Sequence, residues 1–402
     1  MKKDSNEIKK QTIEIKENIM CVVKKCIEQD ISLSKELKNL NLTYDDLCYE
    51  NNSKPEYKKQ KIVTLDDFKE PDAGIPIISF FSGAGGLDLG FEAVGFKHTL
   101  LVEKIPLFCE TLKLNRPEWD VYNGDVSKNE EMINEISKYI GFDEFEGVFV
   151  GGPPCQSFSI AANQRYSKSG ENFKRVGFAH ETNGNLLFDY IALIKKFRPK
   201  VFLIENVPGL MEIDDGEQLA VAYADLEAAG YKINDPIVLR ADHYHVPQQR
   251  IRLFIIGSRT DKLLTLPKPS DDSMVCGNVF EMPLGNAINH VTRAHSAESV
   301  DRYMKLPYGA RDQKGRVDRL DPTKPSKTII AGGNKGGGRS HLHPYFPRTL
   351  SVRESARLQT FPDNYVFAGP VARQFTQVGN AVPPVLAAQI AKSIKDSFFK
   401  TE

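Results

Sequence analysis

The chain has 402 residues, of which 41% are hydrophobic and 26% are charged, and acidic and basic side chains balance to a formal net charge of zero. This length allows two domains, and the composition is that of an ordinary globular protein. Zero net charge excludes a polyanion-binding surface spread over the whole molecule, so a nucleic-acid footprint would have to be local. No apolar run approaches the roughly 20 residues of a membrane-spanning helix, and the amino terminus lacks the apolar core of a secretory signal. We therefore expect a cytoplasmic protein with no membrane partner.

Six cysteines are scattered along the chain, at Cys21, Cys26, Cys48, Cys109, Cys155 and Cys276. None belongs to a Cys-x-x-Cys pair, which argues against a zinc cage and against a disulfide framework. We expect no metal site, and each thiol has to be interpreted by its own position.

Residues 1–70 are rich in Lys, Glu and Asn, with apolar residues at a loosely helical spacing. This pattern predicts a helical extension that ends in the polar linker "ENNSKPEYKKQ". We interpret the extension as a solvated appendage. A small helix-turn-helix is the alternative, although the segment has no basic helix that would favour it.

Between residues 71 and 258, short apolar runs alternate with helical patterns. The runs are "IPIISFF", "HTLLVE", "EGVFVGG", "KVFLIEN" and "RLFIIGS". Runs of Val and Ile bounded by Gly, Pro and Asn, with helices between several of them, indicate a parallel sheet covered on both faces. This region is therefore predicted to be an α/β domain with a mostly parallel, doubly wound sheet.

Residues 259–348 lack this alternation and are rich in Gly, Pro, His and Arg. From residue 291 to residue 348 the chain carries 12 Lys and Arg against 5 Asp and Glu, a basic excess in a neutral chain. Such an excess indicates phosphate contacts, although a surface loop can also be basic without a function. Helical patterns return in residues 349–375 and 376–402.

A glycine loop, "FFSGAGGLDLGF", follows the first predicted strand. Gly83, Gly85 and Gly86 lack a Cβ, so the backbone can turn sharply and approach a ligand closely. Asp88 occupies the sixth position of a G-x-G-x-x-G pattern, so the dinucleotide fingerprint fails. A tight structural turn remains the alternative interpretation of the loop.

Two acidic residues favour a ligand at this loop. Glu103 ends the second predicted strand, 20 positions after Gly83, where an acidic residue binds ribose hydroxyls in nucleotide-binding sheets. Asp125 follows the third strand and would accept a hydrogen bond from an adenine amino group. The pattern fits a nucleoside without a pyrophosphate better than NAD, and S-adenosylmethionine is such a ligand.

The stretch "VGGPPCQSFS" places a cysteine after the fourth predicted strand. Cys155 lies just beyond the carboxyl end of that strand, which is where open α/β sheets bind ligands. Pro153 and Pro154 lock φ and stiffen the loop, so the thiol is aimed. Glu205, at the end of the next strand in "IENVPGL", is either a buried structural acceptor or a proton donor.

Two arginines occur two positions apart in "VPQQRIRLF". Arg250 and Arg252 would share one face of the chain if this segment is a strand. Two like charges on one face need anionic partners, which are Glu205, phosphate or both. Solvation at the surface is the alternative.

The motifs together resemble those of the C5-cytosine DNA methyltransferases. They are "FFSGAGGLDLGF", "GGPPCQSFS", "ENVPGL", "QQRIRLF", "SVRESARLQTFPD" and "QVGNAVPP", in the order seen in that family. The resemblance runs from about Ile75 to the carboxyl terminus and leaves out the first 70 residues. It implies a Rossmann-like S-adenosylmethionine-dependent methyltransferase domain with a smaller, irregular target-recognition domain. The resemblance is to the bacterial type II modification methylases. It implies double-stranded DNA as a partner and, by genetic association, a restriction endonuclease.

The resemblance also implies a mechanism. Cys155 would attack C6 of a flipped-out cytosine while Glu205 holds and protonates N3, so that C5 accepts the methyl group. Loss of the C5 proton would then expel the thiolate. Arg250 and Arg252 would support the flipped nucleotide and the catalytic loop.

Further contacts are implied residue by residue. Phe81 would stack on the adenine, and the other cofactor contacts would come from Ser82, Gly83, Gly85, Gly86, Glu103, Asp125, Val126, Pro154, Leu186, Asn380 and Val382. DNA contacts would come from Ser157, Gln164, Arg165, Thr328, Lys335 and Arg339. Many members carry an acidic residue where this chain has Ser79, so a contact to the methionine end of the cofactor is put in doubt.

The resemblance divides the chain further. Residues 71–258 would form the catalytic domain and residues 259–348 would read the target sequence. Residues 349–375 would form a hinge between the two, with Arg348, Glu354 and Arg357 as bracing residues, and residues 376–402 would return to the catalytic domain. A monomer would suffice for this arrangement.

Three other functions are weighed against this one. An RNA methyltransferase has the same fold, but its Cys-Phe-Thr signature is absent from the recognition region. A catalytically inactive DNA-binding protein would not need Cys155 or Glu205, and this chain retains both. A nicotinamide dehydrogenase is disfavoured by the failed glycine fingerprint.

Overall fold

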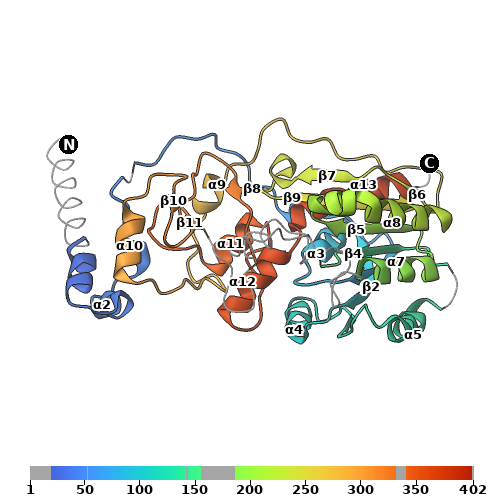
Figure 1. Cartoon of the computed structure of the whole chain (residues 1–402), viewed down its shortest axis with the longest axis horizontal. Helices are drawn as coiled ribbons and strands as arrows, with labels where there is room; N and C mark the ends of the chain where they lie inside the picture. The colour runs from blue at the N-terminus through green and yellow to red at the C-terminus, as the bar shows by residue number, and fades with distance from the viewer. Residues whose placement is uncertain (1–19, 52, 142–143, 155–185, 332–340, 401–402) are drawn as a thin grey trace.

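The computed structural model describes residues 20–51, 53–141, 144–154, 186–331 and 341–400. Figure 1 shows a larger lobe built around a sheet beside a smaller, irregular lobe. We define the larger lobe as the described parts of residues 65–258 and 371–398, and the smaller lobe as those of residues 20–60 and 267–348. The helix α11 (Val352–Leu358) lies where the two meet and is followed by α12 (Val371–Asn380).

The larger lobe contains a sheet of eight strands in the order β3-β2-β1-β4-β5-β9-β6, with β7 also paired to β9. The strands from β1 to β5 are parallel, and β9 runs antiparallel to β5, β6 and β7. The mostly parallel sheet predicted from the Val- and Ile-rich runs is therefore confirmed. The strands are β1 (Ile75–Phe80), β2 (Phe96–Val102), β3 (Val121–Tyr122), β4 (Val148–Gly151), β5 (Val201–Asn206), β6 (Lys232–Ile233), β7 (Ile237–Arg240) and β9 (Ile251–Ser258).

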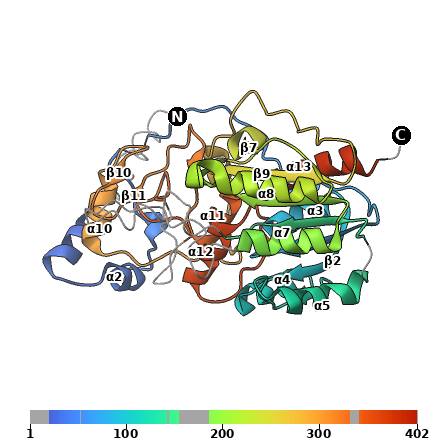
Figure 2. The ribbon, with the colours of Figure 1, turned by 45° about the vertical axis from the view of Figure 1, so that its right-hand side comes forward.

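Helices cover both faces of this sheet (Figure 2). One face packs against α3 (Gly86–Ala93), α4 (Pro106–Asn115) and α13 (Pro384–Phe398), and the other against α5 (Asn129–Ile140), α7 (Leu186–Phe197) and α8 (Glu217–Ala228). Side chains of one strand alternate between the two cores, as Ile77 and Ile78 of β1 do, because successive strand residues point to opposite faces. The sheet is doubly wound, as predicted.

The carboxyl-terminal helix α13 returns to the larger lobe and packs against α3. A Cβ added to Gly90 of α3 would lie 2.5 Å from the Cβ of Ala387, so the two helices approach each other closely. The return of this segment places the turn before α13 next to the glycine loop. The described residues also form four 3₁₀ segments: η1 (Tyr44–Asp46), η2 (Leu65–Phe68), η3 (Pro208–Gly216) and η4 (Ala241–Tyr244).

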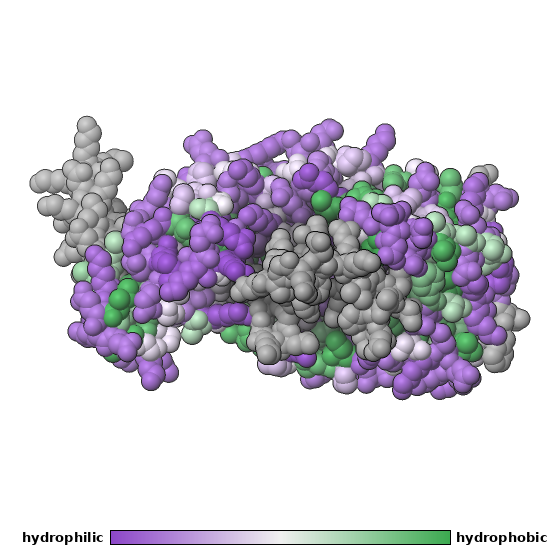
Figure 3. All heavy atoms as spheres, viewed as in Figure 1, coloured by the Kyte–Doolittle hydropathy of each residue, from purple (hydrophilic) through white to green (hydrophobic). Residues whose placement is uncertain are grey.

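The smaller lobe has little regular structure. It contains α2 (Leu33–Asn39), α9 (Gly277–Phe280), α10 (Ala297–Met304), β10 (Arg311–Asp312), β11 (Val317–Asp318) and β12 (Ser326–Lys327). β12 pairs in parallel with β8 (Gln248–Gln249), which directly precedes β9 of the larger lobe. The face of this lobe in Figure 3 is mostly hydrophilic.

Residues 20–51 are not the solvated appendage that the sequence led us to expect. Their apolar side chains form one buried cluster with α10 of the smaller lobe. The spacing of apolar residues predicted helices here, but it carries no information about what those helices pack against. The cluster consists of Val23, Cys26, Leu33, Leu37, Leu47, Ala297, Val300 and Met304.

Three general features concern the described residues alone. No helix among them has the length and apolarity required to cross a membrane. No group of three or more His, Cys, Asp or Glu side chains among them is arranged to hold a metal ion. Cys21, Cys26, Cys109 and Cys276 are free thiols.

Candidate active site at the carboxyl edge of the sheet

The predicted site residues that the structure describes gather where the parallel strands end. β1 leads into the glycine loop, β2 into Glu103, β4 into Gly152 and β5 ends with Glu205 and Asn206. Parallel neighbours bring their carboxyl ends to one edge, which is the edge where open α/β sheets bind ligands. The antiparallel β9 begins at the same edge, because its Leu253 pairs with Asn206.

The glycine loop has a left-handed backbone conformation at three positions. Phe81, Gly83 and Gly85 have φ angles of 55°, 56° and 73°, a region that glycine enters without a steric penalty. A Cβ added to Gly83 would meet only one atom within 4 Å, the carbonyl oxygen of Phe81 at 3.9 Å. Gly83 therefore leaves room above the loop.

Gly85 and Gly86 serve packing instead. A Cβ on Gly86 would lie 2.3 Å from the carbonyl oxygen of Val382, and one on Gly85 would lie 2.8 Å from Leu112. The carboxyl-terminal segment thus closes against the loop, which explains why two of the three predicted glycines are needed even without a ligand. Ser82 is held by Ser79, whose hydroxyl lies 3.0 Å from the Ser82 hydroxyl.

Glu103 is joined to the glycine loop by a hydrogen bond. Its carboxylate accepts from the backbone N–H of Gly83 at 2.8 Å and from that of Ile105 at 2.8 Å. The side chain is only 6% exposed, and burial raises the pKa of the carboxyl group despite these bonds. A carboxylate that accepts one bond on each oxygen still has lone pairs for a ligand hydroxyl.

Asp125 lies beside Glu103 through Lys104, whose ammonium group is 2.7 Å from the Asp125 carboxylate. Burial opposes the charged form of Asp125, but the bonds from Lys104 and Ser127 outweigh it and lower its pKa. The other predicted cofactor residues differ in exposure: Val126, Leu186 and Val382 are buried, whereas Pro154 and Asn380 are exposed.

Glu205 forms an ion pair with Arg252, with Nε of the arginine 2.8 Å from Oε1 of the glutamate. Their side chains are 13% and 15% exposed. The second carboxylate oxygen faces Gly152, since a Cβ on that residue would lie 2.9 Å from it. The anionic partner expected for the arginines is thus Glu205 for Arg252, and the carboxylate lies against the loop that leads to Cys155.

Arg250 has different partners from Arg252, because it precedes β9 rather than lying in it. Its guanidinium donates to the carbonyl oxygens of Gly379 at 3.0 Å, Asn380 at 3.2 Å and Ile329 at 3.3 Å. It is 1% exposed, and Nε finds no partner among the described residues. Burial, followed by the neighbouring Arg252, lowers the pKa of Arg250 well below its ordinary value.

A buried amide network at the junction of the lobes was missed from the sequence. The side chain of Gln248 donates to Gln359 at 2.9 Å and accepts from the N–H of Ile329 at 2.9 Å. Gln359 in turn donates to the carbonyl oxygen of Val378 at 2.6 Å. Glutamines give no periodic signal, so only the repeated "QQ" before the arginines hinted at this network.

Several predicted residues lie outside the described residues. They are Cys155, Ser157, Gln164, Arg165, Lys335 and Arg339. Thr328, the remaining predicted DNA contact, is half-buried, and its hydroxyl donates to the carbonyl oxygen of Gln249 at 2.8 Å. It therefore lies one residue away from the Arg250 junction.

The basic excess of residues 291–348 is partly internal. Arg319 and Arg348 are each 1% exposed and cannot reach a phosphate. Others pair with carboxylates of the same segment, as Arg302 does with Asp312. The excess therefore overstates the phosphate-binding surface of the described part of this segment.

These features define a class of protein. The mainly parallel sheet with the antiparallel β9 beside β5, together with a glycine loop after β1 and a buried acidic residue after β2, is a Rossmann-like methyltransferase fold. A family model described as C-5 cytosine-specific DNA methylase matches residues 75–396. The chain therefore belongs to the C-5 cytosine-specific DNA methylase family and is a DNA (cytosine-5-)-methyltransferase.

Curated relatives and solved structures agree with this assignment. The chain is 34% identical to the type II methyltransferase M.PspPI of Psychrobacter sp., over 84% of this chain and 86% of the relative. It is 33% identical to M.Eco47II of Escherichia coli, over 82% and 81%. A crystal structure of a putative prophage-encoded DNA modification methyltransferase from E. coli superposes with a TM-score of 0.66 at 26% identity, covering 81% of this chain and all of the other.

A more distant structure supports the fold. The DNMT2 mutant of Spodoptera frugiperda gives a TM-score of 0.56 at 15% identity, covering 80% of this chain and 99% of the other.

Proposed function

We propose that the protein transfers a methyl group from S-adenosylmethionine to C5 of a flipped-out cytosine in a specific duplex DNA sequence, through a covalent adduct between Cys155 and C6. The observation that carries this proposal is the Glu205–Arg252 pair at the carboxyl edge of the sheet, with a carboxylate oxygen against Gly152. The nucleophile assigned by resemblance follows Gly152 by three residues, so the acid and the thiol would act on one base.

The residues around the glycine loop fit S-adenosylmethionine. The space above Gly83 admits a ligand, and the buried Glu103 carboxylate retains lone pairs for ribose hydroxyls. Glu103, Asp125 and Phe81 would hold the nucleoside, and no pyrophosphate cradle is needed. When bound, the cofactor supplies an activated methyl group.

The chain's own residues would carry the remaining chemistry. The Cys155 thiolate would bond to C6 while Glu205 gives a proton to N3, which lets the ring accept the electron pair and makes C5 nucleophilic toward the methyl group. Departure of the C5 proton would then regenerate the double bond and expel the thiolate. Arg252 would hold the Glu205 side chain in place through its ion pair.

The target base has to leave the duplex before it can react, which costs a few kcal/mol. Residues 259–348 would offset this cost by contacts with the DNA, with Thr328 at the junction of the lobes as one such contact. A companion restriction endonuclease is proposed because the chain resembles curated type II methyltransferases.

Trapping on duplex DNA that contains 5-fluorocytosine tests the mechanism. Fluorine at C5 cannot leave as a proton, so the wild-type enzyme with S-adenosylmethionine should remain covalently attached to the DNA. Cys155→Ser should abolish trapping and methyl transfer while leaving DNA binding largely intact. Cys21→Ser, which changes an exposed thiol of the amino-terminal segment, is the matched control and should trap normally. Absence of a trapped complex in the wild type, with DNA and cofactor both shown to bind, would favour an inactive DNA-binding protein.

The nucleic acid is tested separately with a labelled methyl donor. Incorporation into duplex DNA but not into transfer RNA supports the proposal, and the reverse result overturns it. Bisulfite sequencing of a methylated plasmid would then identify the target sequence.

A further inference from the structure

The amino-terminal segment, residues 20–51, precedes the part of the chain that matches the family model, which begins at residue 75. In the structure it is built into the smaller lobe, where it shares a buried apolar cluster with α10. Because its apolar side chains are buried in this cluster, the segment is a part of the smaller lobe.

It first supplies half of the cage around a buried cation. Arg319 is 1% exposed, and its guanidinium carbon lies 3.5 Å from the ring centre of Tyr49 and 3.8 Å from that of Tyr308. The guanidinium donates to the carbonyl oxygens of Pro344 at 2.8 Å and Leu306 at 2.6 Å. No carboxylate among the described residues forms an ion pair with it, so the aromatic faces and carbonyl groups alone stabilise the charge.

Tyr49 also contacts the segment that contains His343. It is fully buried, and its hydroxyl donates to the carbonyl oxygen of His343 at 2.8 Å. Two and three residues later in the chain, the backbone N–H groups of Tyr345 and Phe346 donate to the His343 ring at 3.1 and 3.2 Å. Tyr49 thereby contacts both the Arg319 cage and the turn that leads toward α11.

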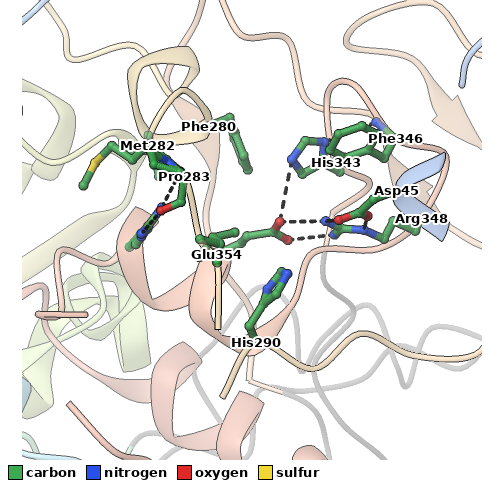
Figure 4. A pocket seen from close by; sticks show the side chains of 13 residues that line it. Asp45, Phe280, Met282, Pro283, His290, His343, Phe346, Arg348 and Glu354 are labelled. Atoms are coloured by element: carbon green, nitrogen blue, oxygen red, sulfur yellow. Dashed lines mark hydrogen bonds and ion pairs between the residues drawn. The ribbon is translucent and has the colours of Figure 1, made fainter. Parts of the chain in front are cut away.

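A second link runs through Asp45. Its carboxylate binds the guanidinium of Arg348, which also makes two bonds of 2.8 Å to Glu354. Figure 4 shows the Glu354 carboxylate between His343 and Arg348, with Asp45 at the guanidinium. Arg348 and Glu354 are each 1% exposed, whereas the Asp45 side chain is 41% exposed. A cavity of about 300 Å³ borders this cluster. The amino-terminal segment and the start of α11 are therefore joined here by charges rather than by close apolar packing.

Glu354 carries the link into the larger lobe. It completes a capping box with Ser351 at the start of α11, and its carboxylate accepts from the Ser351 N–H at 2.7 Å. The apolar residues of α11, Val352, Ala356 and Leu358, belong to the same core as the sheet. A chain of contacts therefore runs from the amino-terminal segment through Arg348 to the catalytic core.

The charge of the segment argues against a direct role in binding phosphate. Residues 20–51 contain four lysines and six carboxylates and no arginine. A phosphate-binding surface needs a local basic excess, which this segment lacks. Its contribution to DNA binding would have to come from the placement of other groups.

We propose that Asp45 and Tyr49 are positioning residues, which hold the DNA-recognition lobe in the orientation that lets the enzyme bind its target. This inference rests on the proposed function of residues 259–348 as the part that reads DNA. It extends the functional machinery into a segment that lies outside the family match.

Asp45→Asn tests the proposal, because it removes the charge and keeps the shape of the side chain. The KM for target duplex DNA should rise about tenfold, a typical size for a change in coupling between lobes. The kcat at saturating DNA and the Kd for S-adenosylmethionine should stay within about twofold of wild type. The slope of log Kd for DNA against log salt should not change, because no phosphate contact is lost. Asp30→Asn, which neutralises an exposed carboxylate of the same segment, is the matched control and should resemble wild type.

Tyr49→Phe is the second variant, since it keeps the ring over Arg319 and removes only the bond to His343. Its KM for DNA should rise about threefold with kcat unchanged. A wild-type KM in both variants overturns the inference. Tighter DNA binding by Asp45→Asn also overturns it, because it would mean that the Asp45 carboxylate only repels the phosphates of DNA. Loss of cofactor affinity together with DNA affinity would mean general unfolding and also overturns it. If wild-type protein fails to methylate duplex DNA, the proposed function itself is contradicted, which is a separate result.

Discussion

The two lobes are stabilised by different kinds of interaction. The larger lobe buries Val, Ile, Leu and Phe side chains on both faces of a regular sheet. The described part of the smaller lobe has two small apolar clusters of its own, a few of its apolar side chains join the core of the sheet, and many of its buried residues are charged or aromatic. The four largest fully buried side chains of the described residues are arginines, and none of them lies within a strand of the sheet: Arg250, Arg319, Arg348 and Arg353.

This difference follows from the hydrogen-bond partners that the backbone groups of each lobe have. Strands satisfy their own backbone groups, so side chains facing the core can be purely apolar. Irregular segments leave carbonyl oxygens unpaired, and a guanidinium with five donors can satisfy several at once. Arg353 illustrates this, because it donates to the carbonyl oxygens of Ile288, Pro362 and Tyr365. The smaller lobe should therefore depend on individual polar contacts more than the larger lobe does.

Glu205→Gln should give the largest effect, and it is confined to the catalytic edge of the larger lobe. Loss of the proton donor should lower kcat by about 10²- to 10⁴-fold, the range for general acid catalysis. Cofactor affinity should change little, because the amide keeps the shape and lies away from the glycine loop. Methyl-transfer kinetics and titration with S-adenosylmethionine measure the two quantities. Glu130→Gln, on the exposed side of α5, is the control, and unchanged turnover in Glu205→Gln would remove this residue from the mechanism.

Glu354→Gln should give the next largest effect, on the stability of the junction between the lobes. It leaves the buried Arg348 guanidinium without its two-bonded carboxylate, which should lower the free energy of unfolding by about 3–5 kcal/mol. Asp363→Asn breaks the ion pair of Arg357 on the same helix, but the Asp363 side chain is 45% exposed. That change should therefore cost no more than about 1 kcal/mol. Urea unfolding measures both, and equal losses would contradict the contrast between buried and exposed pairs.

The same contrast explains which parts of the structure could be predicted from the sequence. Val- and Ile-rich runs predicted β1, β2, β4, β5 and β9 but not β7, because the burial of a strand on both faces leaves a direct mark in hydrophobicity. Chain order then brought Glu103 and Glu205 to one edge, and their distances to the glycine loop and to Arg252 agree with that placement. In a regular sheet, the position of a residue along its strand determines where it lies in space.

The rest could not be predicted for a physical reason. Arg250 and Arg252 are two residues apart, yet β9 begins between them, so one binds carbonyl oxygens and the other binds Glu205. The packing of residues 20–51 depends on long-range pairs such as Tyr49 with Arg319, which have no periodicity. Contacts of this kind are set by the three-dimensional arrangement and leave no local pattern.

Lowering the pH should give a smaller effect that again separates the lobes. Burial lowers the pKa of His343 to about 3 and that of His295 to about 4, from an ordinary value near 6.5, and both residues lie in the smaller lobe. Between pH 6.5 and the lowered values the unfolded chain binds more protons than the folded one, so stability falls as the pH falls. For His343 alone, the loss between pH 7.5 and 5 should be roughly 2 kcal/mol.

The chain's one tryptophan makes this separation measurable. Trp119 is buried in the core of the larger lobe, so its fluorescence follows that lobe, whereas far-UV circular dichroism follows both. Urea transitions by the two probes should coincide at pH 7.5 and separate at pH 5, with the dichroism signal lost first. His343→Asn retains an acceptor for the Tyr345 and Phe346 N–H groups but does not titrate, so it should bring the two transitions closer together at pH 5. Coincident transitions at pH 5 in the wild type would mean that the lobes unfold as one unit, and that the junction through Arg348 is strong enough to hide the difference between them.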